Sequence, residues 1–274
     1  MENGLLARVC KSNEAYLWLG NEHWQAFGAT FVRNRQTPRR RDANHVGLIR
    51  TARLADFEAL LQQAEIEFQG LPHRAFGIDP LTPPFVLARL ALEEGYRSSE
   101  GLVLVLEGEL GAAPRPDVEL REVLTEEDWR LYRELDRLWW LESATGEDAL
   151  GPYDAAHHDE HMLNRRLKAP AVRGWFACVD GVPQAFFSSW PGENGVGVVE
   201  DLFCHPDYRH RGLATALIAH AVADARARGA GPVIINADPK ETPKRMYAAM
   251  GFRPFYVSRT VWKGVAAPED PARA

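Results

Sequence analysis

Arg209-His210-Arg211-Gly212-Leu213-Ala214 is the stretch that decides the fold, because it lies between a predicted strand over 196–204 and a predicted amphipathic helix. The first amides of a helix have no intrahelical partner and lie at its positive end, so they bind phosphate readily. Gly212 lets the backbone approach such a ligand, small Ala214 does likewise, and the two arginines add positive charge. The stretch therefore predicts a diphosphate site, although an arginine-rich turn before a helix is common in proteins.

The residues around this stretch predict a mixed α/β domain. Thr125, with Asp128 three positions later, has the spacing of a capping box that starts a helix. Asp180-Gly181 predicts a tight hairpin between two strands, and Pro243 is a typical first residue of a helix. The predicted strands cover 118–123, 175–179, 184–187, 196–204 and 233–235, and the predicted helices begin near 125, 154, 213 and 243. This order is typical of a mixed central sheet with helices on both faces.

The same half of the chain resembles the GCN5-related N-acetyltransferase (GNAT) superfamily. Arg209 to Ala214 fits the signature (Gln/Arg)-x-x-Gly-x-(Gly/Ala), and Tyr247-x-x-x-Gly251-Phe252 fits the end of the last helix. The resemblance covers about 118–264 and is specific between about 196 and 256. It implies an acyl-CoA N-acyltransferase-like fold, in which loop amides hold the coenzyme A pyrophosphate and two neighbouring strands part to admit the pantetheine arm.

The resemblance also implies which residues contact the coenzyme. These lie on the strand, the turn and the next strand: Leu202, Phe203, Cys204, Arg209, His210, Arg211, Gly212, Leu213, Ala214, Thr215 and Asn236. Cys204 stands where the family usually has a β-branched residue, and Lys240 stands where it often has Asn. The implied reaction is direct transfer of an acetyl group from acetyl-CoA to a primary amine, with no metal.

Two side chains are candidates for the chemistry. Tyr247 would give a proton or a hydrogen bond to the leaving sulfur, and Glu200 or Asp201 would take the proton of the amine, directly or through water. Strand alternation predicts Glu200, Leu202 and Cys204 on one face and Asp201 on the other, and the resemblance favours Glu200. The alternatives are core packing for Tyr247 and a structural hydrogen-bond role for Glu200.

The helices that follow the first strand often form the acceptor wall in this family. By that resemblance, Trp140, Tyr153 and His157 are candidate acceptor contacts, and the acceptor is a small-molecule amine or a peptide N terminus. His157 and His161 are four residues apart, but the zinc-protease pattern requires Glu directly after the first His, where this chain has another His. No metal site is therefore expected.

The first half of the chain is interpreted as a degenerate copy of the second. The proline-containing stretch 111–117 predicts a boundary, which gives domains over 1–112 and 117–265 and a flexible tail over 266–274. Residues 87–108 align with 243–264 at a constant offset of 156 positions. Ala91 falls where Tyr247 lies and no glycine turn follows a strand, so we expect no coenzyme site there, as in tandem members of the superfamily. The run Arg39-Arg40-Arg41 is interpreted as a solvated loop.

Composition limits the remaining function classes. The 274 residues carry a formal net charge of -6 and the pI is about 5.9, which argues against a nucleic-acid partner. Three scattered cysteines fit a reducing compartment, and no apolar run is long enough to cross a bilayer. We expect a cytoplasmic enzyme, monomer or homodimer, that uses acetyl-CoA or another acyl-CoA. The alternative is a non-catalytic acyl-CoA-binding or sensing module on the same fold.

Overall fold

The computed structural model describes residues 2–112, 115, 117–143, 152–240 and 243–265, and the predicted tail over 266–274 lies outside this range. The chain divides into two compact units, which are described separately. Unit 1 takes the described residues of Met1–Gly101, Asp159–Leu167 and Tyr256–Ala274. Unit 2 takes those of Leu102–His158 and Lys168–Phe255. The boundary predicted over 111–117 thus falls inside unit 2.

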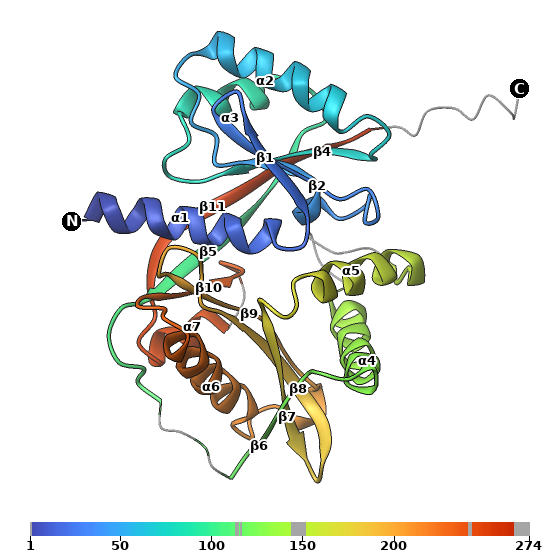
Figure 1. Ribbon diagram of the computed structural model, residues 1–274, viewed down its shortest axis with the longest axis vertical. Helices are drawn as coiled ribbons and strands as arrows, with labels where there is room; N and C mark the ends of the chain where they lie inside the picture. Colours follow the sequence, from blue (N-terminus) through green and yellow to red (C-terminus); the bar gives the residue numbers. More distant parts are fainter. Residues whose placement is uncertain (1, 113–114, 116, 144–151, 241–242, 266–274) are drawn as a thin grey trace, which may run out of the picture. The chain divides into compact units, whose positions relative to one another are not determined.

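Unit 2 has the mixed α/β architecture that the sequence predicts (Figure 1). Its strands are β5 (Arg97–Leu106, which enters this unit at Leu102), β6 (Glu119–Glu122), β7 (Arg173–Val179), β8 (Val182–Trp190), β9 (Gly197–Cys204) and β10 (Val233–Ala237). They are hydrogen-bonded in the order β5-β10-β9-β8-β7-β6. Only β9 and β10 are parallel among these pairs. The helices are α4 (Glu126–Glu142), α5 (Ala155–Leu167, of which the first four residues belong to this unit), α6 (Leu213–Ala227) and α7 (Pro243–Ala249), with a 3-10 turn η2 at Pro206–Tyr208.

Local sequence signals fix the ends of these elements. Asp128 Oδ2 accepts a hydrogen bond from Thr125 N at 2.9 Å, and Asp128 N donates to Thr125 Oγ1 at 3.1 Å, which confirms the predicted capping box of α4. Asp180 and Gly181 both have positive φ, 52° and 76°, as a two-residue turn between β7 and β8 requires. These contacts confirm the elements predicted at these positions.

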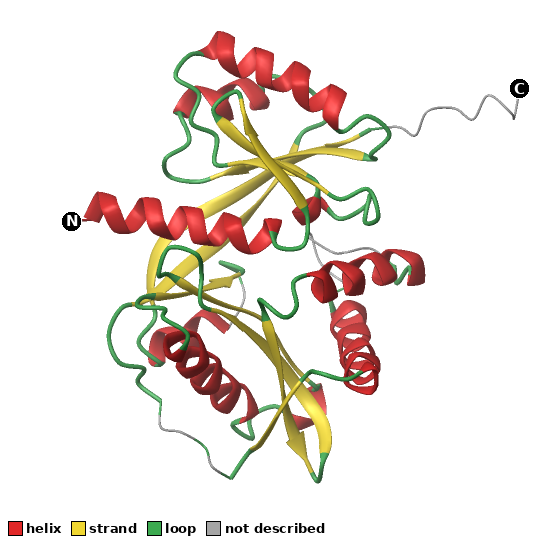
Figure 2. Cartoon of the chain, in the orientation of Figure 1, coloured by secondary structure: helices red, strands yellow, loops and turns green. Residues whose placement is uncertain are grey.

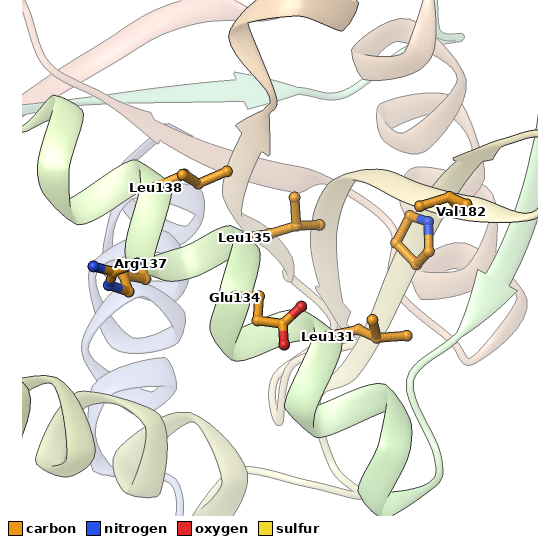
Figure 3. Close-up of a pocket in the computed structure, with 7 residues that line it drawn as sticks. Leu131, Glu134, Leu135, Arg137, Leu138 and Val182 are labelled. Atoms are coloured by element: carbon orange, nitrogen blue, oxygen red, sulfur yellow. The ribbon is translucent and has the colours of Figure 1, made fainter.

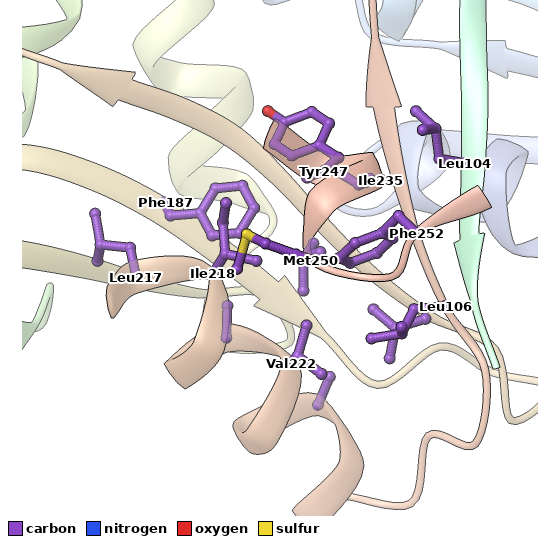
Figure 4. Close-up of a cluster of buried hydrophobic side chains, with 14 of the residues drawn as sticks. Leu104, Leu106, Phe187, Leu217, Ile218, Val222, Ile235, Tyr247, Met250 and Phe252 are labelled. Carbon is purple, nitrogen blue, oxygen red and sulfur yellow. The ribbon is translucent and has the colours of Figure 1, made fainter. Parts of the chain in front are cut away.

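The sheet of unit 2 is covered on both faces (Figure 2). On one face, α6 and α7 pack over a core that includes Phe187, Leu217, Ile235 and Phe252 (Figure 4). On the other face, Tyr132 of α4 packs on Phe186 with ring centroids 4.2 Å apart, and Phe186 packs on Phe203 at 5.7 Å. The two faces therefore have separate apolar layers. The candidate site lies at the carboxyl end of β9.

Unit 1 repeats the same pattern of strand pairing. Its elements are α1 (Glu2–Trp18), β1 (Glu22–Ala26), β2 (Ala29–Arg33), η1 (Arg41–Ala43), β3 (His45–Gly47), α2 (Leu54–Glu67), β4 (His73–Ile78), α3 (Pro84–Ala91) and β11 (Arg253–Gly264, which enters this unit at Tyr256). Consecutive strands β1 to β3 are antiparallel, β3 and β4 are parallel, and β4 pairs with β11 in antiparallel fashion. This matches β7-β8-β9-β10-β5 step by step, so the duplication read from the 156-residue offset extends to the topology. In unit 1 the strand β11 comes from the second half of the chain, and in unit 2 the strand β5 comes from the first half.

The basic run in unit 1 is not a solvated loop, so that interpretation was wrong. Arg39 Nε contacts Glu160 Oε1 at 2.7 Å, and Arg40 Nη2 contacts Asp42 Oδ2 at 2.8 Å. The guanidinium of Arg41 lies 3.9 Å from the ring centroid of Trp262. All three side chains therefore have partners within the unit, which one sequence window could not reveal.

Candidate active site

The two parallel strands of unit 2 part after a short paired region. Among the described residues, β9 and β10 are paired only at Gly197↔Val233 and Val198↔Ile234, although β9 continues to Cys204 and β10 to Ala237. A parallel pair that stops while both strands continue leaves main-chain groups facing a gap. The structure thus has the parted strands that the resemblance implies, with Leu202, Phe203 and Cys204 on the β9 side.

A β-bulge at Asp201 changes which side chains share a face of β9. Asp201 has φ of 68°, and the register with β8 shifts at this point. Val199 belongs to the core beneath α6, and Leu202 and Cys204 pack against the same core. Because neighbouring strand residues face opposite sides, Glu200 faces away from that core. The prediction that Glu200 shares a face with Leu202 and Cys204 was therefore wrong: the extra residue inverts the alternation.

The Glu200 carboxylate reaches across the gap between the strands. Its Oε2 accepts hydrogen bonds from Asn236 N at 3.2 Å and Asn236 Nδ2 at 3.0 Å, so two predicted site residues contact each other. Burial, together with the neighbouring charge of Asp201, raises the pKa of Glu200 to about 7, while the Asn236 hydrogen bonds and the charge of Lys168 oppose this shift. A carboxyl group with a pKa near neutrality can both take and return a proton under physiological conditions.

The turn after β9 presents the N terminus of α6. His210 has φ of 61° and Gly212, the N-cap, has φ of 83°, so both residues adopt the left-handed region that favours glycine. No side chain caps this helix at its N-cap, and the first-turn amides have no intrahelical acceptor. Leu213 is buried in the core, whereas Ala214 and Thr215 are half-buried. The turn can therefore offer main-chain donors to an anion.

The two arginines of the turn differ in their partners. Arg209 contacts Glu142 Oε2 at 2.5 Å and donates from Nε to Cys204 O at 3.1 Å, which ties the turn to the end of α4. Arg211 donates to Asp207 O at 3.2 Å and lies over the ring of Tyr208. Arg209 is therefore already held by a carboxylate, and Arg211 is held by neutral groups.

Arg115 is a residue of this region that sequence reasoning missed. A β-carbon on Gly212 would overlap the Nη1 atom of Arg115, so the guanidinium lies directly over the glycine. Asp117 Oδ2 pairs with this guanidinium at 2.7 Å. The only sequence signal was a charged residue within a proline-containing segment, which is usually solvated.

Tyr247 is largely buried. It is 4% exposed and belongs to the core beneath α6, where its ring lies 6.3 Å from that of Phe252. Figure 4 shows its hydroxyl oxygen directed away from the other labelled side chains. The ring therefore packs in the core, as the alternative interpretation held, while the hydroxyl group points out of the cluster.

The three candidate acceptor contacts lie together at the ends of α4 and α5. Trp140 is fully buried, and its ring meets His157 edge-on at 5.0 Å and Tyr153 at 6.3 Å. Two residues not singled out from the sequence complete this group: His158 Nε2 lies 3.0 Å from Asp136 Oδ2, and Tyr153 Oη lies 3.1 Å from His158 Nδ1. Within the described residues, no three His, Cys, Asp or Glu side chains are grouped closely enough to hold a metal ion.

A separate hollow of about 300 Å³ lies between α4 and the β7–β8 hairpin (Figure 3). Leucines of α4 and the hairpin residues Val182 and Pro183 line it, with Glu134 and Arg137 among them. None of the predicted site residues lines this hollow. In the part of the chain that the structure describes, no helix combines the length and apolar character needed to span a bilayer.

Parallel strands that part just before a glycine turn are the arrangement expected of the acyl-CoA N-acyltransferase-like fold. Residues 126–252 match the family model described as the Acetyltransferase (GNAT) family. Residues 126–252 are therefore a GNAT domain, and the family predicted from the sequence is confirmed for this part of the chain.

Solved structures show the same fold over most of the chain. A GCN5-related N-acetyltransferase from Kribbella flavida matches with a TM-score of 0.66 and 15% identity, over 96% of each chain. A functionally unknown conserved protein from Staphylococcus epidermidis matches with a TM-score of 0.68 and 12% identity, over 91% of this chain and 96% of that one. A tandem GNAT protein from the clavulanic acid biosynthesis pathway matches with a TM-score of 0.56 and 14% identity, over 82% of this chain and 76% of that one. No curated protein matches the chain.

Proposed function

We propose that the chain is an N-acetyltransferase that moves the acetyl group of acetyl-CoA to a primary amine. The observation that carries the proposal is the parting of β9 from β10 immediately before the turn that opens α6. In this arrangement the pantetheine arm would lie along the open edge of β9. The diphosphate would then meet the amides of the first turn of α6.

The charges around this turn support an anionic ligand. The N terminus of a helix carries a partial positive charge. The guanidinium of Arg115 nevertheless lies directly over the N-cap Gly212 of α6, and Arg209 and Arg211 lie in the turn just before this helix. Like charges so close together are unfavourable unless an anion lies among them. The carboxylates of Asp117 and Glu142 offset two of these arginines. A diphosphate would offset the remaining positive charge.

The reaction follows from the groups beside the gap. The amine nitrogen attacks the thioester carbonyl carbon, negative charge develops on the oxygen, and a main-chain N–H near Leu202 stabilises it. The carbon–sulfur bond then breaks, and the thiolate takes a proton from the Tyr247 hydroxyl. Glu200, with its raised pKa, takes the proton that the amine loses, directly or through water. We propose that this reaction takes place in the cytoplasm, where the three free cysteines remain reduced.

The test is acetyl-CoA binding followed by an acceptor screen. Acetyl-CoA should raise the melting temperature, and free thiol should appear faster when a suitable member of a panel of amines and peptides is added. If the protein binds acetyl-CoA but releases thiol at the same slow rate with every acceptor, it is a non-catalytic binding module. The burial of the Tyr247 ring is the observation that favours this second candidate. Absence of any thermal shift at saturating acetyl-CoA would reject both.

A further inference from the structure

The carboxyl group of Glu200 is held from β10, at the point where the two parallel strands have parted. Asn236 donates to Glu200 Oε2 twice, from its main-chain N at 3.2 Å and from Nδ2 at 3.0 Å. A strand between two neighbours directs its N–H groups alternately to either side, and the Asn236 N–H is directed toward β9. The pairing of β9 with β10 has already ended here, so the carboxyl oxygen takes the place of a main-chain acceptor.

Only one of the two carboxyl oxygens of Glu200 is used in this way. Both hydrogen bonds end on Oε2, whereas Oε1 accepts none from any residue that the structure describes, and the residue is half-buried rather than enclosed. N–H groups only donate, so a proton that adds to this carboxyl group is directed to Oε1. The assignment holds for both the ionised and the neutral carboxyl group, because Oε2 is the acceptor for β10 in either form.

The main chain at Glu200 is fixed from β8. Ser188 Oγ donates to the carbonyl oxygen of Glu200 at 2.8 Å and lies 3.4 Å from Asp201 Oδ2. Ser188 is 4% exposed and lies opposite Glu200 in the register, where the bulge begins. A bulge disrupts the ladder of main-chain hydrogen bonds, and the hydroxyl group supplies a donor at this point. The bulge that turns Glu200 away from the core beneath α6 is therefore held by a side chain of the neighbouring strand.

Stability alone does not require a carboxyl group at this position. A glutamine would accept the same two hydrogen bonds through its amide oxygen, without an ionisable group. The folded protein instead raises the pKa of Glu200 to about 7, through burial and the charge of Asp201 and against the effects of Asn236 and of the Lys168 charge. A raised carboxyl pKa means that the charged form is less stable in the folded protein than in water. Function rather than folding therefore explains the ionisable group.

We propose that Asn236 and Ser188 are positioning residues for Glu200: Asn236 holds Oε2 from β10, Ser188 fixes the bulge from β8, and Oε1 takes the proton of the amine. In that step the N–H bond breaks, its electron pair stays on nitrogen, and an O–H bond forms at Oε1. The inference rests on the proposed function, because it names the groups that orient the base of the same site. It gives Asn236 a role on Glu200 in place of the coenzyme contact that the family resemblance implies.

Nuclear magnetic resonance of the unliganded wild-type protein tests the contact without any acceptor. The side-chain carboxyl carbon of Glu200 and the main-chain amide proton of Asn236 are followed across pH. Both signals should titrate with the same midpoint, because the amide donates to the group whose charge changes. An Asn236 amide signal that ignores the Glu200 titration would overturn the proposal, and this result does not depend on the folding of any variant.

Asn236→Ala removes the Nδ2 donor and leaves the main-chain donor in place. The titration midpoint of Glu200 should rise by about one pH unit, since a hydrogen bond to a charged group changes the ionisation constant about tenfold. Asn194→Ala is the matched control, because Asn194 is also half-buried and its Oδ1 accepts from Val196 N within its own loop. The control should leave the Glu200 midpoint unchanged. A midpoint that stays or falls in Asn236→Ala would overturn the proposal.

Adjacent serines of β8 separate the bulge from general stability. Ser188→Ala removes the contact with Glu200, whereas Ser189→Ala removes a hydrogen bond of 2.5 Å to Asp224 of α6. The pH-dependent movement of the Asn236 amide proton should be about halved or lost in Ser188→Ala, because a hydrogen bond weakens steeply once its geometry is disturbed. It should persist in Ser189→Ala. Equal behaviour of the two variants would overturn the role of Ser188.

Two further measurements separate this inference from the proposed function. The thermal shift with acetyl-CoA should persist in Asn236→Ala; its loss, with an unchanged Glu200 midpoint, would make Asn236 a coenzyme contact and overturn the proposal. With an acceptor from the screen, the rise in rate with pH should move in Asn236→Ala by as much as the Glu200 signal, and a rate profile that stays in place would also overturn it. A wild-type protein with matching titrations but no acetyl-CoA shift would instead refute the proposed function alone.

Discussion

Replacing Gly212 with alanine separates ligand binding from helix stability. Gly212 has φ of 83° at the N terminus of α6, and Gly229 has φ of 102° just past its C terminus. An alanine with such a positive φ costs about 1–2 kcal/mol, so each variant should lose a similar amount of stability. For a domain of this size that corresponds to a lower melting temperature by about 2–8 °C. Gly229→Ala is therefore a control with matched backbone strain.

Only one of the two substitutions changes the candidate site. A β-carbon at Gly212 would overlap the guanidinium of Arg115 and crowd the first-turn amides, whereas a β-carbon at Gly229 meets nothing within 4 Å. At a concentration one hundred times the Kd, acetyl-CoA should stabilise the wild-type protein by about 2.7 kcal/mol. A tenfold weaker Kd in Gly212→Ala would reduce this to about 1.4 kcal/mol at the same concentration.

Differential scanning fluorimetry with and without acetyl-CoA measures both effects. The ligand-induced shift should be about halved or lost in Gly212→Ala and unchanged in Gly229→Ala. A full shift in Gly212→Ala would show that the diphosphate does not bind at this turn. An equal loss in both variants would show that helix stability, not a contact at the turn, controls binding.

Further outcomes follow from the contacts described above. Glu200→Gln should remove the rise in rate that the wild type shows as pH increases through about 7, measured by thiol release across pH. The folded-state pKa of Glu200 lies above its unfolded value, so folding is accompanied by proton binding at pH values between the two. Wild-type stability should therefore fall as the pH rises from about 4.5 to about 7. Glu200→Gln should lack this fall in urea unfolding measured across pH. Tyr247→Phe should keep acetyl-CoA affinity by calorimetry while turnover drops about a hundredfold; weaker binding would contradict its role as proton donor. Thr125→Ala should cost about 1 kcal/mol in urea unfolding, since the helix loses its cap to Asp128. Calorimetry should find one acetyl-CoA per chain, and a second site would contradict the interpretation of unit 1.

Local chemistry made much of unit 2 predictable. The Thr125 cap, the Asp180-Gly181 turn and the glycine before α6 act over a few residues, and each element formed where it was expected. The bulge at Asp201 was not predictable in the same way. Aspartate tolerates positive φ but does not require it, and the register with β8 decides the matter. One extra residue was enough to reverse the expected face of Glu200.

Long-range pairing was also beyond the sequence patterns. The repeat of 156 residues indicates two similar halves, but nothing local indicates that β5 pairs with β10 and β11 with β4. Strand partners depend on which edges meet during folding, and the periodicity of a single strand carries no information about its neighbour. Likewise, the Asp136–His158 pair joins residues 22 positions apart through burial rather than through a motif.

The comparison of the two units explains why the same topology need not hold two coenzymes. In unit 1, β3 and β4 are also parallel, and within the described residues their register pairs Val46 with Phe76 alone. Glu14 of α1, 8% exposed, fills this region: its carboxylate bonds His45 Nε2 at 2.6 Å and lies where a β-carbon on Gly47 would be. In unit 2 the corresponding strands receive the carboxylate of Glu200, which comes from β9 itself and bonds only the β10 edge at Asn236 among the contacts resolved in the described residues. In unit 1 the carboxylate that fills the gap between the parallel strands comes from a helix, whereas in unit 2 it comes from the strand β9 itself, and this difference supports the proposal that the coenzyme binds in unit 2.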